Sequence, residues 1–136
     1  VMGILSAIAI PAFTSMLPGM RLNGAARTVM GDLMAARMKA VKLNQKTKVF
    51  FEDSYQYRIC DDADNNDTVD SGEGDVKTRT IQTDYPGVTI DKGEYNDPVF
   101  QPRGTASIII LTLTNSEGTQ KEVKVHLTGR IKIEDI

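Results

Sequence analysis

The chain has 136 residues, enough for one domain with a modest hydrophobic core. Its formal net charge of -2 argues against a general nucleic-acid-binding surface, although the charge is unevenly distributed, with a basic N-terminal third and an acidic stretch at residues 61–75. The single cysteine, Cys60, excludes an intrachain disulfide, and we expect it at the end of a strand.

The first segment, residues 1–17, carries no charged side chain and predicts an apolar helix. It falls just short of the roughly 20 residues that cross a bilayer, and it lacks the basic start and cleavage site of a secretory signal. Pro11 predicts a kink and Pro18-Gly19 a stronger interruption, so we expect residues 12–20 to be bent or partly unwound. The alternative is an ordinary core helix with one kink. The rest of the chain would then have to be much larger to bury the whole apolar surface of the helix.

From Arg21 to Leu43 or Asn44 the pattern predicts an amphipathic helix, with basic residues opposite a single apolar stripe. The stripe recurs at spacings of three and four residues: Leu22, Ala26, Val29, Leu33, Ala36, Ala40 and Leu43. We expect four of these residues to dock the helix onto the rest of the chain: Leu22, Val29, Leu33 and Ala36.

Everything after Thr47 predicts strands and turns. Residues 47–52 and 54–60 read as a hairpin that turns near Asp53, with Tyr55, Tyr57 and Ile59 on one face. Shorter strands at 76–82 and 88–90 flank a turn at 84–87.

The C-terminal third predicts a second hairpin. Residues 107–114 are apolar on both faces and should form a central strand, followed by a turn at 115–118. In the next strand, 122–127, Val123, Val125 and Leu127 should point inward, and Gly129 marks a bulge or sharp bend before residues 130–133.

Four motifs, in order, resemble known sequences. GILSAIAIPAF resembles the later part of the hydrophobic N-terminal helix of type IV pilins and type II secretion pseudopilins. AARTVMGDLMAARMKAVKLNQKTKV resembles the helix-to-strand segment of the GspH/FimT family, and VFQPRGT and HLTGRIKI resemble its Phe-x-Pro-x-Gly and Gly-Arg strand motifs. Together they cover nearly the whole chain.

The resemblance implies an α+β fold: a long, kinked N-terminal helix packed on a head of antiparallel strands in two small sheets. Residues 1–20 would form the stem and residues 21–136 the head. The family also has a basic leader, a cleavage site and about ten further residues before the point that aligns with Val1, so we expect the stem to be N-terminally incomplete.

The implied function is that of a structural subunit, a minor pilin or minor pseudopilin, anchored in the bacterial inner membrane with its head in the periplasm. Its partners would be other pilin or pseudopilin subunits, and the mature N-terminus of such subunits is methylated. Insertion and bundling would depend on the stem residues Val1, Ile4, Leu5, Ile8, Ile10, Pro11 and Phe13. The alternative is a DNA- or ligand-binding tip subunit that acts through its head.

Catalysis has little support, because His126 is the only histidine and no nucleophile or phosphate-loop motif is present. Nucleic-acid binding would depend on basic residues, with Arg58, Lys77 and Arg79 sharing one strand face. Arg103, Arg130 and Lys132 would form a second group near the C-terminal motifs. Neither group has the interleaved aromatic residues that grip single strands.

The acidic stretch has the ligand spacing of a twelve-residue calcium loop that starts at Asp62. Oxygen ligands would come from Asp62, Asp64, Asn66, Thr68, Asp70 and Glu73. Asp67 occupies the sixth position, where Gly is usual, but Asp tolerates the left-handed conformation better than most residues. The sequence therefore predicts a Ca²⁺ site, with a solvated Asp- and Asn-rich hairpin loop as the alternative.

Overall fold

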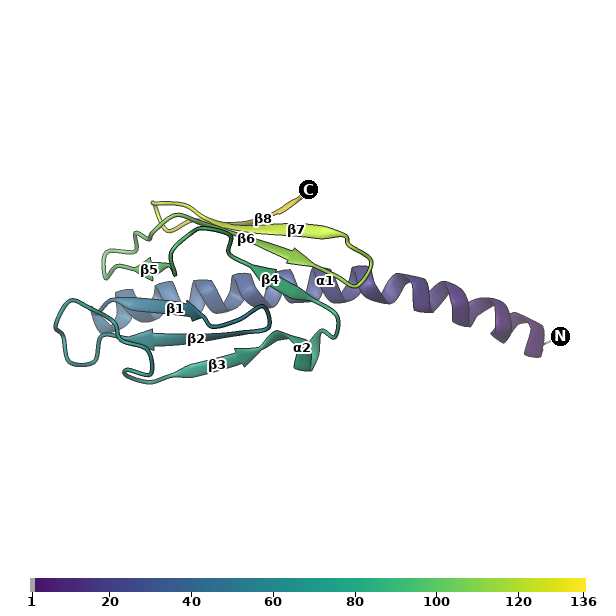
Figure 1. Ribbon diagram of the computed structural model, residues 1–136, viewed down its shortest axis with the longest axis horizontal. Coiled ribbons are helices and arrows are strands. Elements are labelled where there is room, and N and C mark those ends of the chain that lie inside the picture. The colour runs from purple at the N-terminus through teal and green to yellow at the C-terminus, as the bar shows by residue number, and fades with distance from the viewer. Residues whose placement is uncertain (1) are drawn as a thin grey trace.

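The computed structural model describes the backbone of residues 2–136 and the side chains of residues 17–136. Helix α1, Met2–Leu43, is the longest element, and its N-terminal half extends beyond the rest of the molecule (Figure 1). The helix is continuous through Pro11 and Pro18-Gly19, so the expected partial unwinding of residues 12–20 is wrong. A proline removes only one intrahelical hydrogen bond, and the gentle curve of the ribbon can absorb its steric clash.

The C-terminus of α1 is capped as the sequence suggests. Asn44 has a left-handed backbone with φ of 54°, and the N–H of Gln45 donates to the carbonyl oxygen of Ala40 over 3.2 Å. This closure satisfies a carbonyl that the helix leaves without a partner. Leu43 is 45% exposed, contrary to its expected place in the buried stripe, because it faces an open groove that Met38 and Lys42 also line.

Two four-stranded antiparallel sheets form the head, as predicted, and both lie along the C-terminal half of α1 (Figure 1). The first has the order β3-β2-β1-β5, with β1 at Thr47–Phe51, β2 at Gln56–Asp61, β3 at Lys77–Thr80 and β5 at Val99–Phe100. The second has the order β4-β6-β7-β8, with β4 at Thr89–Asp91, β6 at Ile109–Thr114, β7 at Gln120–Val125 and β8 at Ile131–Asp135.

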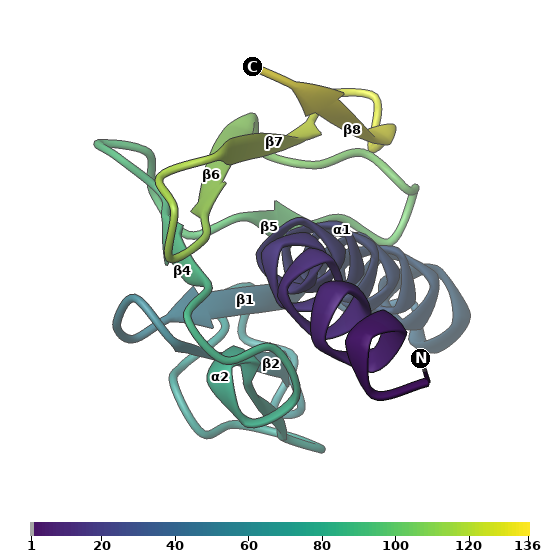
Figure 2. The ribbon, with the colours of Figure 1, turned by 90° about the vertical axis from the view of Figure 1, so that its right-hand side faces the viewer.

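The core lies where both sheets meet the helix, as the view along α1 shows (Figure 2). On β6, alternate residues Ile109, Leu111 and Leu113 are buried, and two of them pair across the ladder with Val125 and Val123 of β7. Strand β6 has neighbours on both sides, which confirms its predicted central position. Period-two burial of this kind is what one covered sheet face requires.

The first hairpin turns near Asp53, as predicted. One carboxylate oxygen, Oδ1, accepts hydrogen bonds from the backbone N–H groups of Tyr55 and Gln56, at 2.7 and 2.9 Å. This side-chain cap holds Tyr55 in the turn, so β2 begins only at Gln56. Tyr55 is therefore exposed, unlike Tyr57 and Ile59, whose predicted inward position is confirmed.

Two further expectations about the strands need correction, and one strand was not predicted. Leu127 is 65% exposed because β7 ends at Val125, so the strand alternation no longer applies to it. The end of the expected strand at 76–82 is instead a single helical turn, α2 at Ile81–Asp84. The two-residue strand β5 was not predicted, because so short a strand depends on its pairing with β1 rather than on a local pattern.

Candidate functional sites

The interface between α1 and the head buries the four predicted docking residues completely. Leu22, Val29, Leu33 and Ala36 are each no more than 1% exposed and belong to the common core. Near the start of this interface, the ring of Tyr85 packs directly against Gly24 of α1. A side chain at position 24 would prevent this contact, because its Cβ would lie only 2.5 Å from Cε1 of Tyr85. The sequence pattern therefore identified the helix face that packs on the sheets.

An ionic cluster inside this interface was not predicted. Asp32 of α1 is buried, and its Oδ2 accepts hydrogen bonds from the Tyr57 hydroxyl at 2.6 Å and from Nε of Arg79 at 2.8 Å. Its Oδ1 lies 3.1 Å from Nη2 of Arg79 and 3.3 Å from Nζ of Lys77. The helix is thus joined to β2 and β3 by a carboxylate with several donors.

The charges of this cluster stabilise one another. Burial by itself would raise the pKa of Asp32, but the hydrogen bonds from Arg79 and Tyr57 and the charges of Arg79 and Lys77 hold it below its usual value of 3.8. Burial and the neighbouring carboxylate raise the pKa of Tyr57.

The sequence did contain a sign of this buried carboxylate. Asp32 is the first acidic residue of the chain, and it lies three residues after Val29 and four before Ala36, at the edge of the apolar stripe.

The two C-terminal glycine motifs and the helix motif meet at one point. Nε of Arg37 donates to the carbonyl oxygen of Gly104 over 2.9 Å. Gly129 packs against the same carbonyl, and a Cβ on Gly129 would collide with it and with Nε of Arg37. Gly104 and Gly129 both have positive φ, at 90° and 87°, so glycine is required here by conformation as well as by space.

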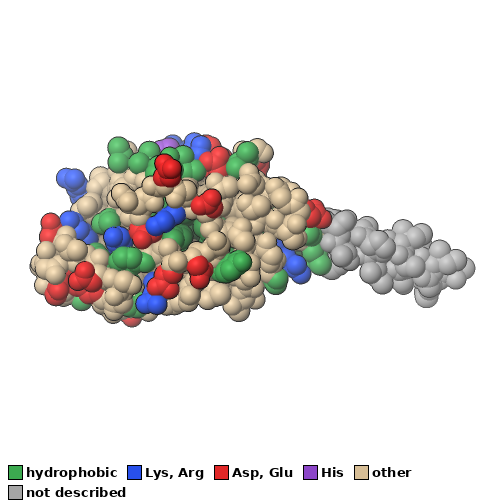
Figure 3. Space-filling model, viewed as in Figure 1, with side chains coloured by type: hydrophobic (Ala, Val, Ile, Leu, Met, Phe, Trp, Pro, Cys, Tyr) green, Lys and Arg blue, Asp and Glu red, His purple; other side chains and the backbone are tan. Residues whose placement is uncertain are grey.

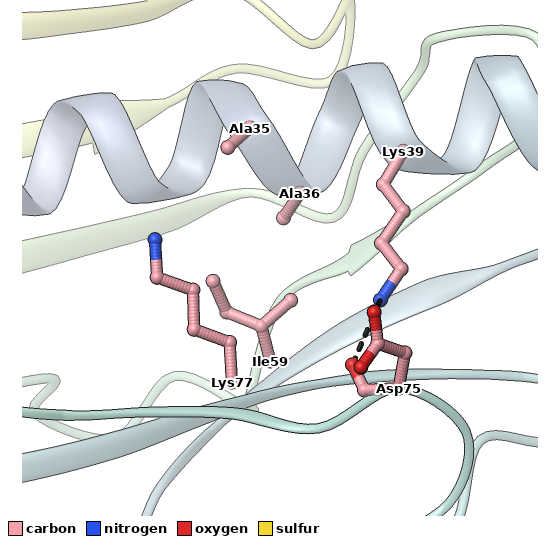
Figure 4. A pocket seen from close by; sticks show the side chains of 6 residues that line it. All are labelled: Ala35, Ala36, Lys39, Ile59, Asp75 and Lys77. Atoms are coloured by element: carbon pink, nitrogen blue, oxygen red, sulfur yellow. Dashed lines mark hydrogen bonds and ion pairs between the residues drawn. The ribbon is translucent and has the colours of Figure 1, made fainter.

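A shallow groove lies between α1 and strands β2 and β3, with a volume of about 220 Å³ (Figure 4). Ala35, Ala36 and Ile59 form its apolar lining. Lys39 closes one end by donating to the backbone carbonyl of Asp75 over 2.8 Å, and it also pairs with Asp61 at 3.4 Å. Lys77 at the other end belongs to the Asp32 cluster, so both cations of the groove are already engaged.

Three of the six predicted calcium ligands converge. Ligand atoms of Asp62, Asp64 and Glu73 all lie within 4.8 Å of one another. Asp67 in the sixth position has φ of 72°, so it does adopt the left-handed conformation that the loop needs there. Asp70 is exposed in the same loop, and its carboxylate is not part of this group. The exposed Asn66 contacts the group, because its backbone N–H donates to Asp62 and its side-chain amide donates to Asp64.

Backbone N–H groups already contact these carboxylates. Asp62 accepts from the N–H groups of Asn66 and Asp67 at 3.1 and 2.9 Å, and Glu73 accepts from those of Asp64 and Asp70 at 3.1 and 2.8 Å. Those bonds lower the pKa of Glu73. Desolvation raises the pKa of Asp64, and hydrogen bonds with Asp62 and Glu73 together with the charge of Glu73 raise it further, because all of these favour the protonated form.

The basic residues considered for nucleic-acid binding are dispersed. Arg79 pairs with Tyr57 in the β2–β3 register, whereas Arg58 pairs with Thr78, so Arg58 lies on the opposite sheet face from Lys77 and Arg79 and the expected shared face is wrong. Arg58 is bound to Glu52 at 2.8 Å, and Lys132 forms an ion pair with Glu134.

The stem residues proposed for insertion and bundling, Val1, Ile4, Leu5, Ile8, Ile10, Pro11 and Phe13, have side chains outside the described residues. No helix in the described part of the chain meets the length and hydropathy expected of a membrane span.

Comparison with known proteins decides the family. The family described as Type II transport protein GspH matches residues 25–129, well over half of the chain. The chain belongs to the GspH family. No curated protein sequence matches this GspH-family chain.

Solved structures share its fold. The type IV minor pilin FimU of Pseudomonas aeruginosa is similar with a TM-score of 0.63 and 16% identity, over 83% of this chain and 87% of that one. The minor pseudopilin EpsH from the Type 2 Secretion System of Vibrio cholerae has a TM-score of 0.64 and 14% identity, over 85% of this chain and 97% of that one. The predicted family and α+β pilin-like fold are therefore confirmed.

Proposed function

We propose that this GspH-family chain is a structural subunit, a minor pilin or minor pseudopilin, that joins a type IV pilus or type II secretion pseudopilus through its N-terminal helix. One observation carries the proposal. A single helix has an uncharged apolar segment, of which residues 2–17 extend beyond the head, whereas one face of its C-terminal half is buried in the head from Leu22 onward. An uncharged helix left without a partner needs an apolar environment.

A membrane would provide this apolar environment before assembly, and the stems of neighbouring subunits would provide it afterwards. A helix satisfies its backbone hydrogen bonds internally, so the same segment is stable in lipid and in a helical bundle. The head would then lie in the periplasm and form the outer part of the filament. The descriptions of FimU as a type IV minor pilin and of EpsH as a minor pseudopilin of a Type 2 Secretion System support this role.

The stem can be tested by comparing the full chain with one that begins at Arg21. A start near Arg27 would remove Leu22, Ala25 and Ala26 from the core and destabilise the head. We expect the full chain to fractionate with membranes and sheared filaments, and the shortened chain to fold but to be absent from both fractions.

A charge in the stem provides a matched comparison. Ile8→Asp should abolish recovery in membranes and filaments, because a buried carboxylate is costly in hydrocarbon. Asn23→Asp, at an exposed position of the same helix, should leave recovery unchanged. Equal recovery of the full chain, the shortened chain and Ile8→Asp would show that the stem does not direct assembly, and the proposal would then be wrong.

The alternative role, a DNA- or ligand-binding tip subunit, depends on Arg103 and Arg130, which are exposed and form no ion pair with a described carboxylate. Binding of duplex DNA should then weaken steeply with salt. The pairing of Lys77, Arg79 and Lys132 with acidic residues of the head makes this role weaker than assembly.

We also propose that the loop of residues 62–73 binds Ca²⁺ through Asp62, Asp64 and Glu73, with Asn66, Thr68 and Asp70 as further oxygen donors. The convergence of the three carboxylates and the left-handed Asp67 support it. Hard oxygen ligands from a single loop suit Ca²⁺ better than Mg²⁺, which demands a stricter geometry.

A further inference from the structure

A polar hollow lies between α1 and the second sheet, near the point where the stem leaves the head. It has a volume of about 280 Å³ and is lined by Asn23, Ala26, Arg27, Lys121 and Ile133. The first three residues belong to α1, and the other two belong to the neighbouring strands β7 and β8. The view along α1 shows β8 and α2 on different sides of the helix (Figure 2). We call these five lining residues the stem-end hollow.

The stem-end hollow has one positive charge in excess. Arg27 is exposed, and no carboxylate in the described part of the chain forms an ion pair with it. Lys121 is bound to Asp135, with 2.7 Å between Nζ and Oδ1, so these two charges cancel. An ammonium group has three N–H donors and needs only one for Asp135, which leaves donors for a second anion. The hollow is therefore suited to a ligand group with a single negative charge.

The position of the hollow along α1 matches the surface of a membrane. No charged side chain precedes Arg21, so the uncharged segment extends to Met20. Asn23 is three residues further on, about 5 Å along the helix axis, and the headgroup layer on each side of a bilayer is about 5–7 Å thick. Helical side chains lean toward the N-terminus, so the long side chain of Arg27 leans back toward this layer.

We propose that the stem-end hollow binds the phosphate of an anionic glycerophospholipid while the chain is anchored in the membrane. This inference rests on the proposed function, in which the apolar stem lies in the membrane before assembly. An inserted stem would hold the hollow against a surface that is dense in phosphate groups. The ligand is therefore a lipid headgroup rather than a phosphate ion from solution.

The residues of the hollow match the parts of such a headgroup. The guanidinium of Arg27 presents a fork of N–H donors that fits two phosphate oxygens, and Lys121 adds a compact positive charge. The side-chain amide of Asn23 can donate to the phosphate or to a headgroup hydroxyl. Ala26 is buried and Ile133 is partly buried, so together they form an apolar wall for the glycerol carbons.

The bound headgroup would orient the head and would not anchor the chain. Acidic as well as basic side chains lie at the stem end of the head in the space-filling view, so this end has no uniformly basic surface (Figure 3). Selectivity for an anionic lipid would then depend on the few residues of the hollow. Asn23→Asp should weaken headgroup binding and still leave recovery with membranes unchanged, because the stem supplies the anchoring.

Headgroup binding can be measured by native mass spectrometry of the full chain in a nonionic detergent. The anionic probe is dihexanoylphosphatidylglycerol, and the zwitterionic probe is dihexanoylphosphatidylcholine. We expect wild type to bind the anionic lipid about tenfold more tightly at low salt, and the difference to shrink at high salt. Arg27→Gln/Lys121→Gln should bind both lipids equally weakly. Lys42→Gln/Arg103→Gln removes the same charge at exposed positions far from the hollow and should bind like wild type.

Inorganic phosphate distinguishes a lipid site from a site for the free ion. If it displaces dihexanoylphosphatidylglycerol at a concentration equal to that of the lipid, the hollow is a free-phosphate site and the proposal fails. Equal binding of the two lipids by wild type, or equal weakening by the two double variants, would also overturn it. These measurements need no membrane insertion, whereas recovery of Ile8→Asp with membranes tests the proposed function separately.

Discussion

Arg37 and Gly104 are joined by a hydrogen bond of 2.9 Å, from the guanidinium Nε on α1 to a backbone carbonyl between β5 and β6. The bond fixes the helix to a loop that is 67 residues away in the sequence. Gly129, from a third part of the chain, closes over the same carbonyl. Three of the four sequence motifs that indicate the family therefore serve one packing contact.

Gly129→Ala should be strongly destabilising, because a Cβ would clash with the Gly104 carbonyl and would also force alanine into a positive φ. We expect a loss of roughly 2–4 kcal/mol in the free energy of unfolding, measured by urea denaturation. Gly118→Ala is the matched control, since Gly118 has a φ of 82° but no atom within 4 Å of the added Cβ. It should cost only the backbone strain, about 1–2 kcal/mol, and equal losses for the two variants would contradict the close contact.

Leu33→Ala should leave a cavity between α1 and the sheets and reduce the free energy of unfolding by roughly 2–5 kcal/mol. The adjacent Met34 is 43% exposed, so Met34→Ala should cost well under half as much. Thermal and urea denaturation of both variants give the comparison. Lys39→Ala is unsuitable as a neutral control, because Lys39 pairs with the buried Asp61 and with Asp75. A larger loss from Met34→Ala than from Leu33→Ala would mean that the helix presents another face.

Asp32→Asn should lower stability most at neutral pH. The pKa of Asp32 is depressed in the folded state, so its charge stabilises the fold fully above the usual value of 3.8, and this contribution is lost as the pH falls through the lower folded pKa. We expect a loss of about 2–4 kcal/mol at neutral pH, since breaking a buried pair leaves Arg79 without its partner. The difference from wild type should shrink as the pH falls below 3.8 and through the lower folded pKa of Asp32.

Urea denaturation across this pH range measures the effect of Asp32. Glu117→Gln, in an exposed turn and with no ion pair to a described residue, is the control and should follow the wild-type curve at every pH. A difference between Asp32→Asn and wild type that stays constant down to the lowest pH would show that packing, not charge, is what the substitution removes.

Calcium should raise the melting temperature if residues 62–73 bind it. At ten times the dissociation constant the gain is about 1.4 kcal/mol, and extracellular-type loops bind at roughly 10⁻⁴ to 10⁻³ M. A melting scan in millimolar Ca²⁺, against Mg²⁺ and against chelator, measures the shift. Asp64→Asn/Glu73→Gln should remove the calcium-specific rise, and Asp84→Asn/Asp91→Asn, outside the loop, should keep it. An equal rise in all variants, or none in wild type, would leave the loop as a solvated turn.

Local patterns in the sequence determined much of the fold. The spacing of Leu22, Val29, Leu33 and Ala36 defined the packed face of α1, because helical periodicity and burial are directly linked. A continuous apolar run located β6 and period-two alternation located β7, and Asn44 and Asp53 marked a helix end and a hairpin turn. The acidic spacing from Asp62 to Glu73 likewise indicated carboxylates that converge.

Only the tertiary structure decided which polar groups meet. Asp32 joins Tyr57, Lys77 and Arg79 because β2 and β3 pair in one register beneath the helix, and the same register places Arg58 on the opposite face. The meeting of Arg37, Gly104 and Gly129 depends on how two loops pack against α1. Side-chain periodicity reports the face of one element, whereas these contacts depend on the relative placement of several, and that placement is fixed by packing of the whole core.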